Sequence, residues 1–116
     1  MNPILEAPTE RHYATVVAGA GPAGIMAALA ASSAGSVLLV DSSAIPRNKS
    51  CGGMLHMDTQ SFLGAFGELP DSIVVEPQYV NFRYHDWDRG ILKPTELKFL
   101  NIDRPVFDHW MLSLLG

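Results

Sequence analysis

The chain has 116 residues, of which 47% are hydrophobic and 17% are charged. This composition is typical of a packed globular domain and excludes a disordered chain. Eight Lys and Arg against twelve Asp and Glu give a formal charge of -4. No basic cluster occurs along the chain, so we expect no nucleic-acid partner. A single cysteine excludes an internal disulfide and favours a reducing, cytoplasmic location.

Residues 1–12 mix prolines and charges without a hydrophobic period, so we expect a flexible leader there. The start of the chain carries two Glu and no basic run, unlike a signal peptide. No residue from Tyr13 to Val40 is charged, but glycines, a proline and serines divide this stretch into short pieces. We therefore predict no transmembrane segment.

A strand-helix-strand unit is predicted next. The apolar runs YATVVA (13–18) and SVLLVD (36–41) are typical of buried parallel strands. Between them, PAGIMAALAASSA (22–34) is rich in helix formers, has a proline in its first turn and stops before Gly35. A crossover of this kind should be right-handed.

The second half of the chain has a different pattern. A polar loop, SSAIPRNKSCGG, precedes a helix predicted from about Met54 to Phe66. Alternating apolar and polar residues over 73–86 and 90–102 predict two antiparallel strands joined by a turn. The last segment, 104–116, predicts the opening of a helix, with four core residues at helical spacing: Phe107, Trp110, Leu112 and Leu115. Residues 13–116 thus predict an α/β fold, a Rossmann-like unit followed by a helix and antiparallel strands.

The sequence GAGPAG, residues 19–24, lies where the first strand meets the helix. A GxGxxG pattern at this position is typical of a site for the pyrophosphate of a dinucleotide. Gly19 permits a tight turn, Gly21 has no Cβ to keep phosphates away, and Gly24 lets the helix lie close to the sheet. The helix N-terminus supplies unpaired N–H groups and a partial positive charge. The predicted contacts from this loop are Gly19, Gly21, Pro22, Ala23 and Gly24.

Two charged residues extend the predicted dinucleotide site. Asp41 ends the second strand, where a carboxylate can accept hydrogen bonds from an adenosine ribose, although a solvated strand end is the alternative. Arg47 can pair with ribose or phosphate oxygens as a planar donor, or it is an exposed loop arginine. The histidines His12, His56, His85 and His109 have no ligand spacing, so we expect no metal site.

Three motifs together resemble the geranylgeranyl reductase family of FAD-dependent oxidoreductases: GAGPAG, PRNKSCGG (46–53) and RPVFDHWM (104–111). The family pattern P-R-x-K-x-C-G-G is matched at every fixed position. R-x-x-F-D-x-x-L is matched except that Met111 replaces the leucine. The resemblance spans residues 13–113, whereas family members are several times longer. It implies that this chain is the incomplete N-terminal portion of a larger flavoprotein fold.

The resemblance also implies a cofactor and a reaction. FAD would be held by the strand-helix-strand unit, and reduced flavin would deliver hydride to a C=C bond of a polyprenyl substrate. NADPH or another reductant would supply the electrons. Cys51, Gly52, Gly53 and Arg104 would contact the flavin nucleotide. Cys51 would act as a proton donor or redox partner, or only as a small packing residue. Arg104 could instead pair with Asp108. A helix starting near Met54 would present N–H groups to the flavin.

Other interpretations remain open. Flavin-dependent hydroxylases and halogenases resemble this chain in fold, but halogenases typically have an IGES-like sequence where this chain has CGG. The chain is too short for activity alone, so a catalytically silent dinucleotide-binding or interaction fragment is the second interpretation. Such a fragment would associate with itself or with a complementing chain. A third interpretation, an NAD-binding module, is supported by the glycine loop alone. A lipid substrate would favour peripheral association with membranes.

Overall fold

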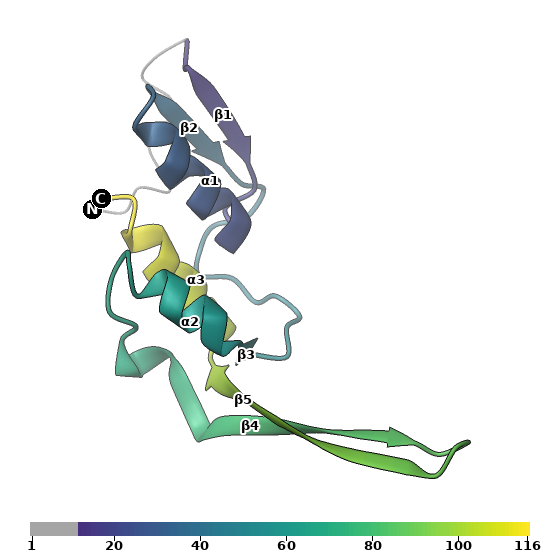
Figure 1. Ribbon diagram of the computed structural model, residues 1–116. Coiled ribbons are helices and arrows are strands. Elements are labelled where there is room, and N and C mark those ends of the chain that lie inside the picture. Colours follow the sequence, from purple (N-terminus) through teal and green to yellow (C-terminus); the bar gives the residue numbers. More distant parts are fainter. Residues whose placement is uncertain (1–11) are drawn as a thin grey trace. The chain divides into compact units, whose positions relative to one another are not determined.

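A computed structural model describes residues 12–116, apart from the side chain of Glu96 (Figure 1). The leader predicted over residues 1–12 lies almost entirely outside the described residues. The chain divides into two compact units. The first contains the residues up to Lys49 together with Pro105–Gly116, and the second contains Ser50–Arg104.

The first unit is built on the predicted strand-helix-strand crossover. Strand β1 (Thr15–Ala18) pairs in parallel with β2 (Val37–Val40), from Thr15 opposite Val37 to Ala18 opposite Val40. Helix α1 (Pro22–Ser32) connects them and packs against both strands along one face of the sheet (Figure 1). Ile25 and Ala28 are buried, which follows from their spacing on one side of the helix. The three elements are confirmed, each shorter than its predicted range.

Close packing of α1 on the sheet depends on Gly24. A Cβ atom at this position would lie 1.7 Å from the carbonyl oxygen of Gly19 and 2.9 Å from its carbonyl carbon. Both atoms belong to the backbone and cannot rotate away. Gly19 itself has a φ of 105°, in the region that favours glycine. The two glycines therefore set how tightly the chain turns from β1 into α1.

Helix α3 (Arg104–Ser113) confirms the helix predicted at the end of the chain. Its residues from Pro105 onward belong to the first unit. Phe107, Met111 and Leu112 are buried, and Trp110 and Leu115 are half-buried. Asp108, which is fully buried, lies on the same helix.

The second unit is a three-stranded antiparallel sheet with a short helix. It contains β3 (Met54–Leu55), α2 (Met57–Leu63), a single 3-10 turn η2 (Asp71–Ile73), β4 (Val74–Asp86) and β5 (Ile91–Ile102). The strand order is β3-β5-β4. The predicted pair of long antiparallel strands is confirmed, and Figure 1 shows it as a ribbon extending away from α2. The core consists of Leu55, Leu63, Ile73, Leu100 and Ile102.

The prediction that a helix begins near Met54 is wrong. Met54 and Leu55 pair with Asn101 and Leu100 of β5, and α2 begins only at Met57. The Ile102 amide also donates to the Gly53 carbonyl at 2.7 Å, so backbone pairing holds the chain extended up to this point. His56 then caps the helix, since its Nδ1 accepts from the Asp58 amide at 3.2 Å.

Strands β4 and β5 join through a tight turn. Gly90 has a φ of 63°, and the Asp86 carboxylate accepts from the Arg89 amide at 3.1 Å. The pairing register shifts between Asn81 and Arg83, where the Thr95 hydroxyl donates to the Phe82 carbonyl at 2.9 Å. Among the described residues, none of the helices has the length and apolar character of a membrane span.

We predict that Gly24→Ala lowers the free energy of unfolding by about 1–3 kcal/mol, because the added methyl group forces α1 away from β1. Urea unfolding followed by far-UV circular dichroism measures the effect. Gly21→Ala is the matched control, since a Cβ at Gly21 would meet no atom within 4 Å. Equal stability of the two variants would show that this contact does not restrain the helix.

Candidate cofactor site

The glycine loop joins the carboxyl ends of the two parallel strands. The Gly19 amide donates to the Val40 carbonyl at 2.7 Å, which continues the β1–β2 pairing into the loop. The Ile25 amide donates to the Gly21 carbonyl at 3.0 Å, which is the first hydrogen bond of α1. The loop is thus fixed on one side by the sheet and on the other by the helix. Ligands of open α/β sheets bind at this end of the strands.

The start of α1 leaves room for an anion. Gly21 is the N-cap residue, and no side chain caps the helix there. A Cβ at Gly21 would have open space around it. Because Pro22 has no amide proton, the N–H groups of the next residues, Ala23 and Gly24, are the first that the helix can present. An uncapped N-terminus with this opening suits a phosphate group.

Asp41 anchors the glycine loop to the end of β2. Its Oδ2 accepts from the Ala20 amide at 2.7 Å, and its Oδ1 accepts from the Ser43 amide at 2.9 Å and from Arg47 Nη1. The Ala20 hydrogen bond, followed by the Arg47 guanidinium and the Ser43 amide, lowers the pKa of Asp41 from 3.8 to about 2. The carboxylate is therefore ionised throughout the physiological range.

Arg47 and Asp41 form an ion pair that is mostly shielded from water. Their side chains are 19% and 10% exposed, respectively. Neither of the alternatives considered for these residues, an exposed loop arginine and a solvated strand end, describes this arrangement. The pair lies beside Ala20, so a charged donor and a charged acceptor adjoin the glycine loop.

Cys51, Gly52, Gly53 and Arg104 gather in the second unit, where β3 begins and β5 ends. The Cys51 sulfur accepts from the Gly53 amide at 3.4 Å and from Arg104 Nη1 at 3.3 Å. Gly53 has a φ of 65°, and a Cβ there would lie 2.6 Å from the Ile102 carbonyl oxygen. A Cβ at Gly52 would lie 2.9 Å from Met54 Cε. The exposed thiol is thus held on a glycine backbone next to a guanidinium.

The predicted site residues fall into two groups, one in each compact unit. The first unit contains Gly19, Gly21, Pro22, Ala23, Gly24, Asp41 and Arg47, and the second contains Cys51, Gly52, Gly53 and Arg104. Sequence reasoning missed the amides of Ala20 and Ser43, which hold the Asp41 carboxylate. The Ser43 contact had a signal, because Asp followed by Ser-Ser is typical of a turn in which the carboxylate accepts from the amide two residues on.

Comparisons with known proteins identify relatives that are longer than this chain. No protein-family model matches the sequence. Protein CbrA of Escherichia coli strain K12 and protein CbrA of Shigella sonnei strain Ss046 are each 31% identical to this chain over 114 residues. Each alignment covers 90% of this chain and 31% of the relative. The chain therefore spans about a third of the length of these curated relatives.

Solved structures give the fold. A triple mutant of the flavin-dependent brominase Bmp2 superposes with a TM-score of 0.68 and 19% identity, over 90% of this chain and 27% of the brominase chain. The halogenase PltM, in complex with ethyl mercury and mercury, gives a TM-score of 0.52 and 20% identity over 89% of this chain and 26% of its own. The predicted part of a larger flavoprotein fold is confirmed: the chain has the mixed α/β fold of a portion of a flavin-dependent halogenase.

Proposed function

We propose that this chain binds FAD through the glycine loop between β1 and α1, as part of a flavin-dependent oxidoreductase. The observation that carries the proposal is the uncapped N-terminus of α1, which has open space at Gly21 and an ionised Asp41 beside the loop. The fold shared with the flavin-dependent brominase supports it. The pyrophosphate would lie on the amides of the first turn of α1.

Asp41 retains room for one further hydrogen bond. An ionised carboxylate has about four acceptor positions, two on each oxygen. Among the described residues, Oδ1 accepts from Ser43 and Arg47, and Oδ2 accepts from Ala20 alone. Oδ2 can therefore receive a single ribose hydroxyl. The remaining N–H groups of Arg47 would serve a second ribose oxygen or a phosphate oxygen, so the two side chains would bind the adenosine half together.

The resemblance to geranylgeranyl reductases assigns the residues of the second group to the reactive half of the cofactor. Gly52 and Gly53 would let the backbone approach a flat ring, with the Cys51 thiol and Arg104 beside it. Bound flavin, reduced by NADPH or another reductant, would supply a hydride for a C=C bond of a polyprenyl substrate. In this proposal Cys51 donates the accompanying proton. The PRNKSCGG and RPVFDHWM motifs support this finer assignment, through their resemblance to geranylgeranyl reductases.

The structural similarity to a brominase and a halogenase favours a second candidate, an oxygen-dependent flavin reaction. The two candidates differ in their second substrate. A reductase consumes reduced flavin anaerobically when a polyprenyl compound is added. A monooxygenase or halogenase consumes it with dioxygen, and a halogenase requires a halide ion in addition. A catalytically silent fragment would do neither.

FAD binding is tested by titration, read from flavin absorbance and fluorescence and from bleaching by dithionite. We expect the wild-type chain to bind FAD and Gly21→Ala to bind it at least about tenfold more weakly, because the methyl group displaces the pyrophosphate. Gly64→Ala is the matched control, since a Cβ there makes ordinary contacts at 3.4 Å and 3.5 Å. If the wild-type chain binds no FAD, the proposal is refuted. If Gly21→Ala binds FAD as tightly as the wild type, FAD does not bind at the glycine loop.

A second prediction concerns Asp41 and pH. Its pKa is lowered from 3.8 to about 2 in the folded chain, so the carboxylate stabilises the fold above pH 3.8 and this contribution is lost as the pH falls through about 2. The contribution is on the order of 2 kcal/mol. Asp41→Asn should therefore destabilise the chain at neutral pH and remove that part of the acid dependence of urea unfolding. Asp88→Asn, in the exposed β4–β5 turn, should keep the wild-type profile.

The role of Cys51 is tested in an active form of the protein, one that catalyses the reduction of the substrate. Cys51→Ala should slow the anaerobic oxidation of reduced flavin by a geranylgeranyl substrate by about a hundredfold, as expected for loss of a positioned proton donor. Its FAD affinity should change much less. The measurement is stopped-flow absorbance of the flavin. An unchanged rate would leave Cys51 with a packing role only.

A further inference from the structure

The Asp41 carboxylate bridges two loops of the first unit. Its Oδ2 accepts from the Ala20 amide of the glycine loop at 2.7 Å. Its Oδ1 accepts from the Ser43 amide at 2.9 Å and from Arg47 Nη1, both in the loop that follows β2. All four residues belong to the same compact unit. The carboxylate therefore links the conformation of one loop to that of the other.

The two donors at Oδ1 fix the orientation of the Asp41 carboxylate. Because both carboxylate oxygens lie in one plane, the side chain cannot rotate about its Cβ–Cγ bond without breaking the hydrogen bonds to Oδ1. Oδ2 is then directed at the Ala20 amide. Ala20 is buried, so its amide needs an acceptor within the protein.

Arg47 supplies the charge that keeps Asp41 in this position. The Asp41 side chain is 10% exposed, and its pKa is lowered to about 2, mainly by the Ala20 hydrogen bond and then by Arg47. It is thus an ion that is largely shielded from water. Removing one partner of a shielded ion pair is strongly unfavourable for the charge that is left. Without Arg47, the carboxylate would turn toward water, and this rotation would take Oδ2 away from Ala20.

We propose that Arg47 is a positioning residue of the dinucleotide site: through its ion pair with Asp41, it holds the glycine loop in the ligand-binding conformation before the cofactor binds. This role is separate from any contact that Arg47 makes with the ligand itself. Ala20 directly precedes Gly21, the N-cap of α1, where the pyrophosphate would lie. A loop that is already ordered loses less conformational entropy on binding. The effect on FAD rests on the proposed function, whereas the effect on the free loop does not.

The first measurement uses the 116-residue chain without FAD. Amide hydrogen exchange is followed by NMR, and the rate at Ala20 is divided by the rate at Ala28, which is buried in the middle of α1. We expect Arg47→Gln to raise this exchange ratio at least about tenfold. A general loss of stability would accelerate both amides, so the ratio reports the release of the loop alone.

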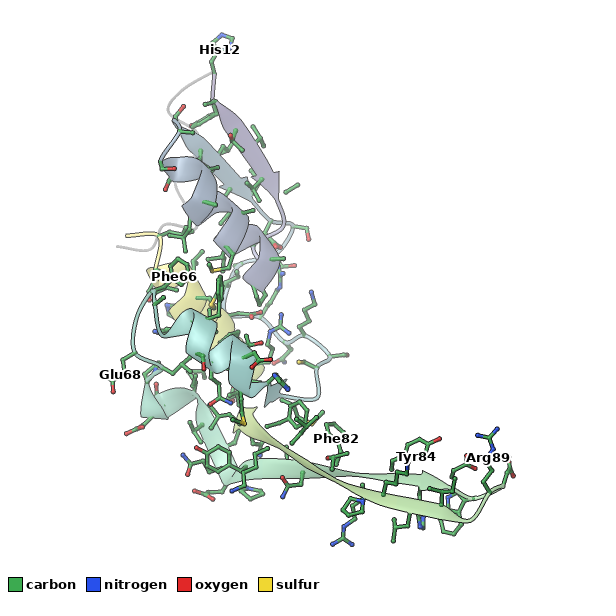
Figure 2. The ribbon with its side chains drawn as sticks, in the orientation of Figure 1. His12, Phe66, Glu68, Phe82, Tyr84 and Arg89 are labelled. Carbon is green, nitrogen blue, oxygen red and sulfur yellow. The ribbon has the colours of Figure 1, made fainter. Side chains whose placement is uncertain are left out.

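Two matched variants accompany Arg47→Gln. Arg47→Lys keeps the positive charge, and because the contact with Asp41 is made by one nitrogen, Nη1, an ammonium group can replace it. Its exchange ratio should stay within about threefold of wild type. Arg89→Gln removes the same charge from an ion pair with Asp86, but the Arg89 side chain is 77% exposed. Figure 2 shows Arg89 at the tip of the β4–β5 ribbon, and this variant should have the wild-type ratio.

If Arg47→Gln does not fold, Asp41→Asn tests the same link. The amide side chain of Asn has one acceptor oxygen, which the Ser43 and Arg47 donors would hold. Its NH2 group would then face the Ala20 amide, from which it cannot accept a hydrogen bond. The exchange ratio should again rise at least about tenfold.

The second measurement is FAD affinity, read from flavin fluorescence. Arg47→Gln should weaken FAD binding at least about tenfold, and Arg47→Lys should stay within about threefold of wild type. In the Asp41→Asn background, Arg47→Gln should weaken FAD binding at most about threefold, because only a direct contact with the ligand is left to lose.

Two results would overturn the proposal. One is an exchange ratio that does not rise when the Asp41–Arg47 pair is broken. The other is an equal loss of FAD affinity on Arg47→Gln in both backgrounds, which would make Arg47 a direct ligand only. If the wild-type chain binds no FAD, the proposed function fails, but the exchange ratio still decides whether Arg47 holds the glycine loop.

Discussion

The close approach of α1 to β1 is the constraint on which the candidate site depends. Gly24 lies against the Gly19 carbonyl, and no residue with a Cβ fits there. Because the helix can lie this close, its N-terminus is directed at the carboxyl ends of β1 and β2, where the Asp41 carboxylate receives the Ala20 amide. A wider turn would separate the helix N-terminus from the acid. The arrangement that suits a dinucleotide thus follows from the absence of one methyl group.

Elements that depend on local patterns were predictable from the sequence. The strand-helix-strand unit, the long antiparallel pair and α3 each have a period or a terminal residue that can be recognised without knowledge of the rest of the chain. Met54 and Leu55 were misassigned because their extended conformation comes from pairing with Asn101 and Leu100, far along the sequence. No local signal in MLHMDTQ distinguishes a short strand followed by a His cap from the first turn of a helix.

In the candidate site, too, some features follow from local sequence patterns and others depend on contacts between distant residues. The glycine loop and Asp41 were predictable because each position in the GxGxxG unit has a fixed physical task. The Asp41–Arg47 pair was not, since both residues were assigned to the ligand and their contact with each other depends on how the intervening loop folds. Cys51 and Arg104 are 53 positions apart, and the register of β5 brings them to 3.3 Å. The resemblance assigned them to one cofactor but gave no contact between them.

The hydrogen bond between Asp41 and Ala20 also bears on the order in which the chain folds. It links residues 21 positions apart, whereas α1 is held by contacts between residues four apart. Local contacts form first, because closing a longer loop costs more chain entropy. The glycine loop therefore becomes rigid only once β2 has joined β1. During synthesis, the glycine loop therefore cannot take its final conformation until Asp41 has left the ribosome.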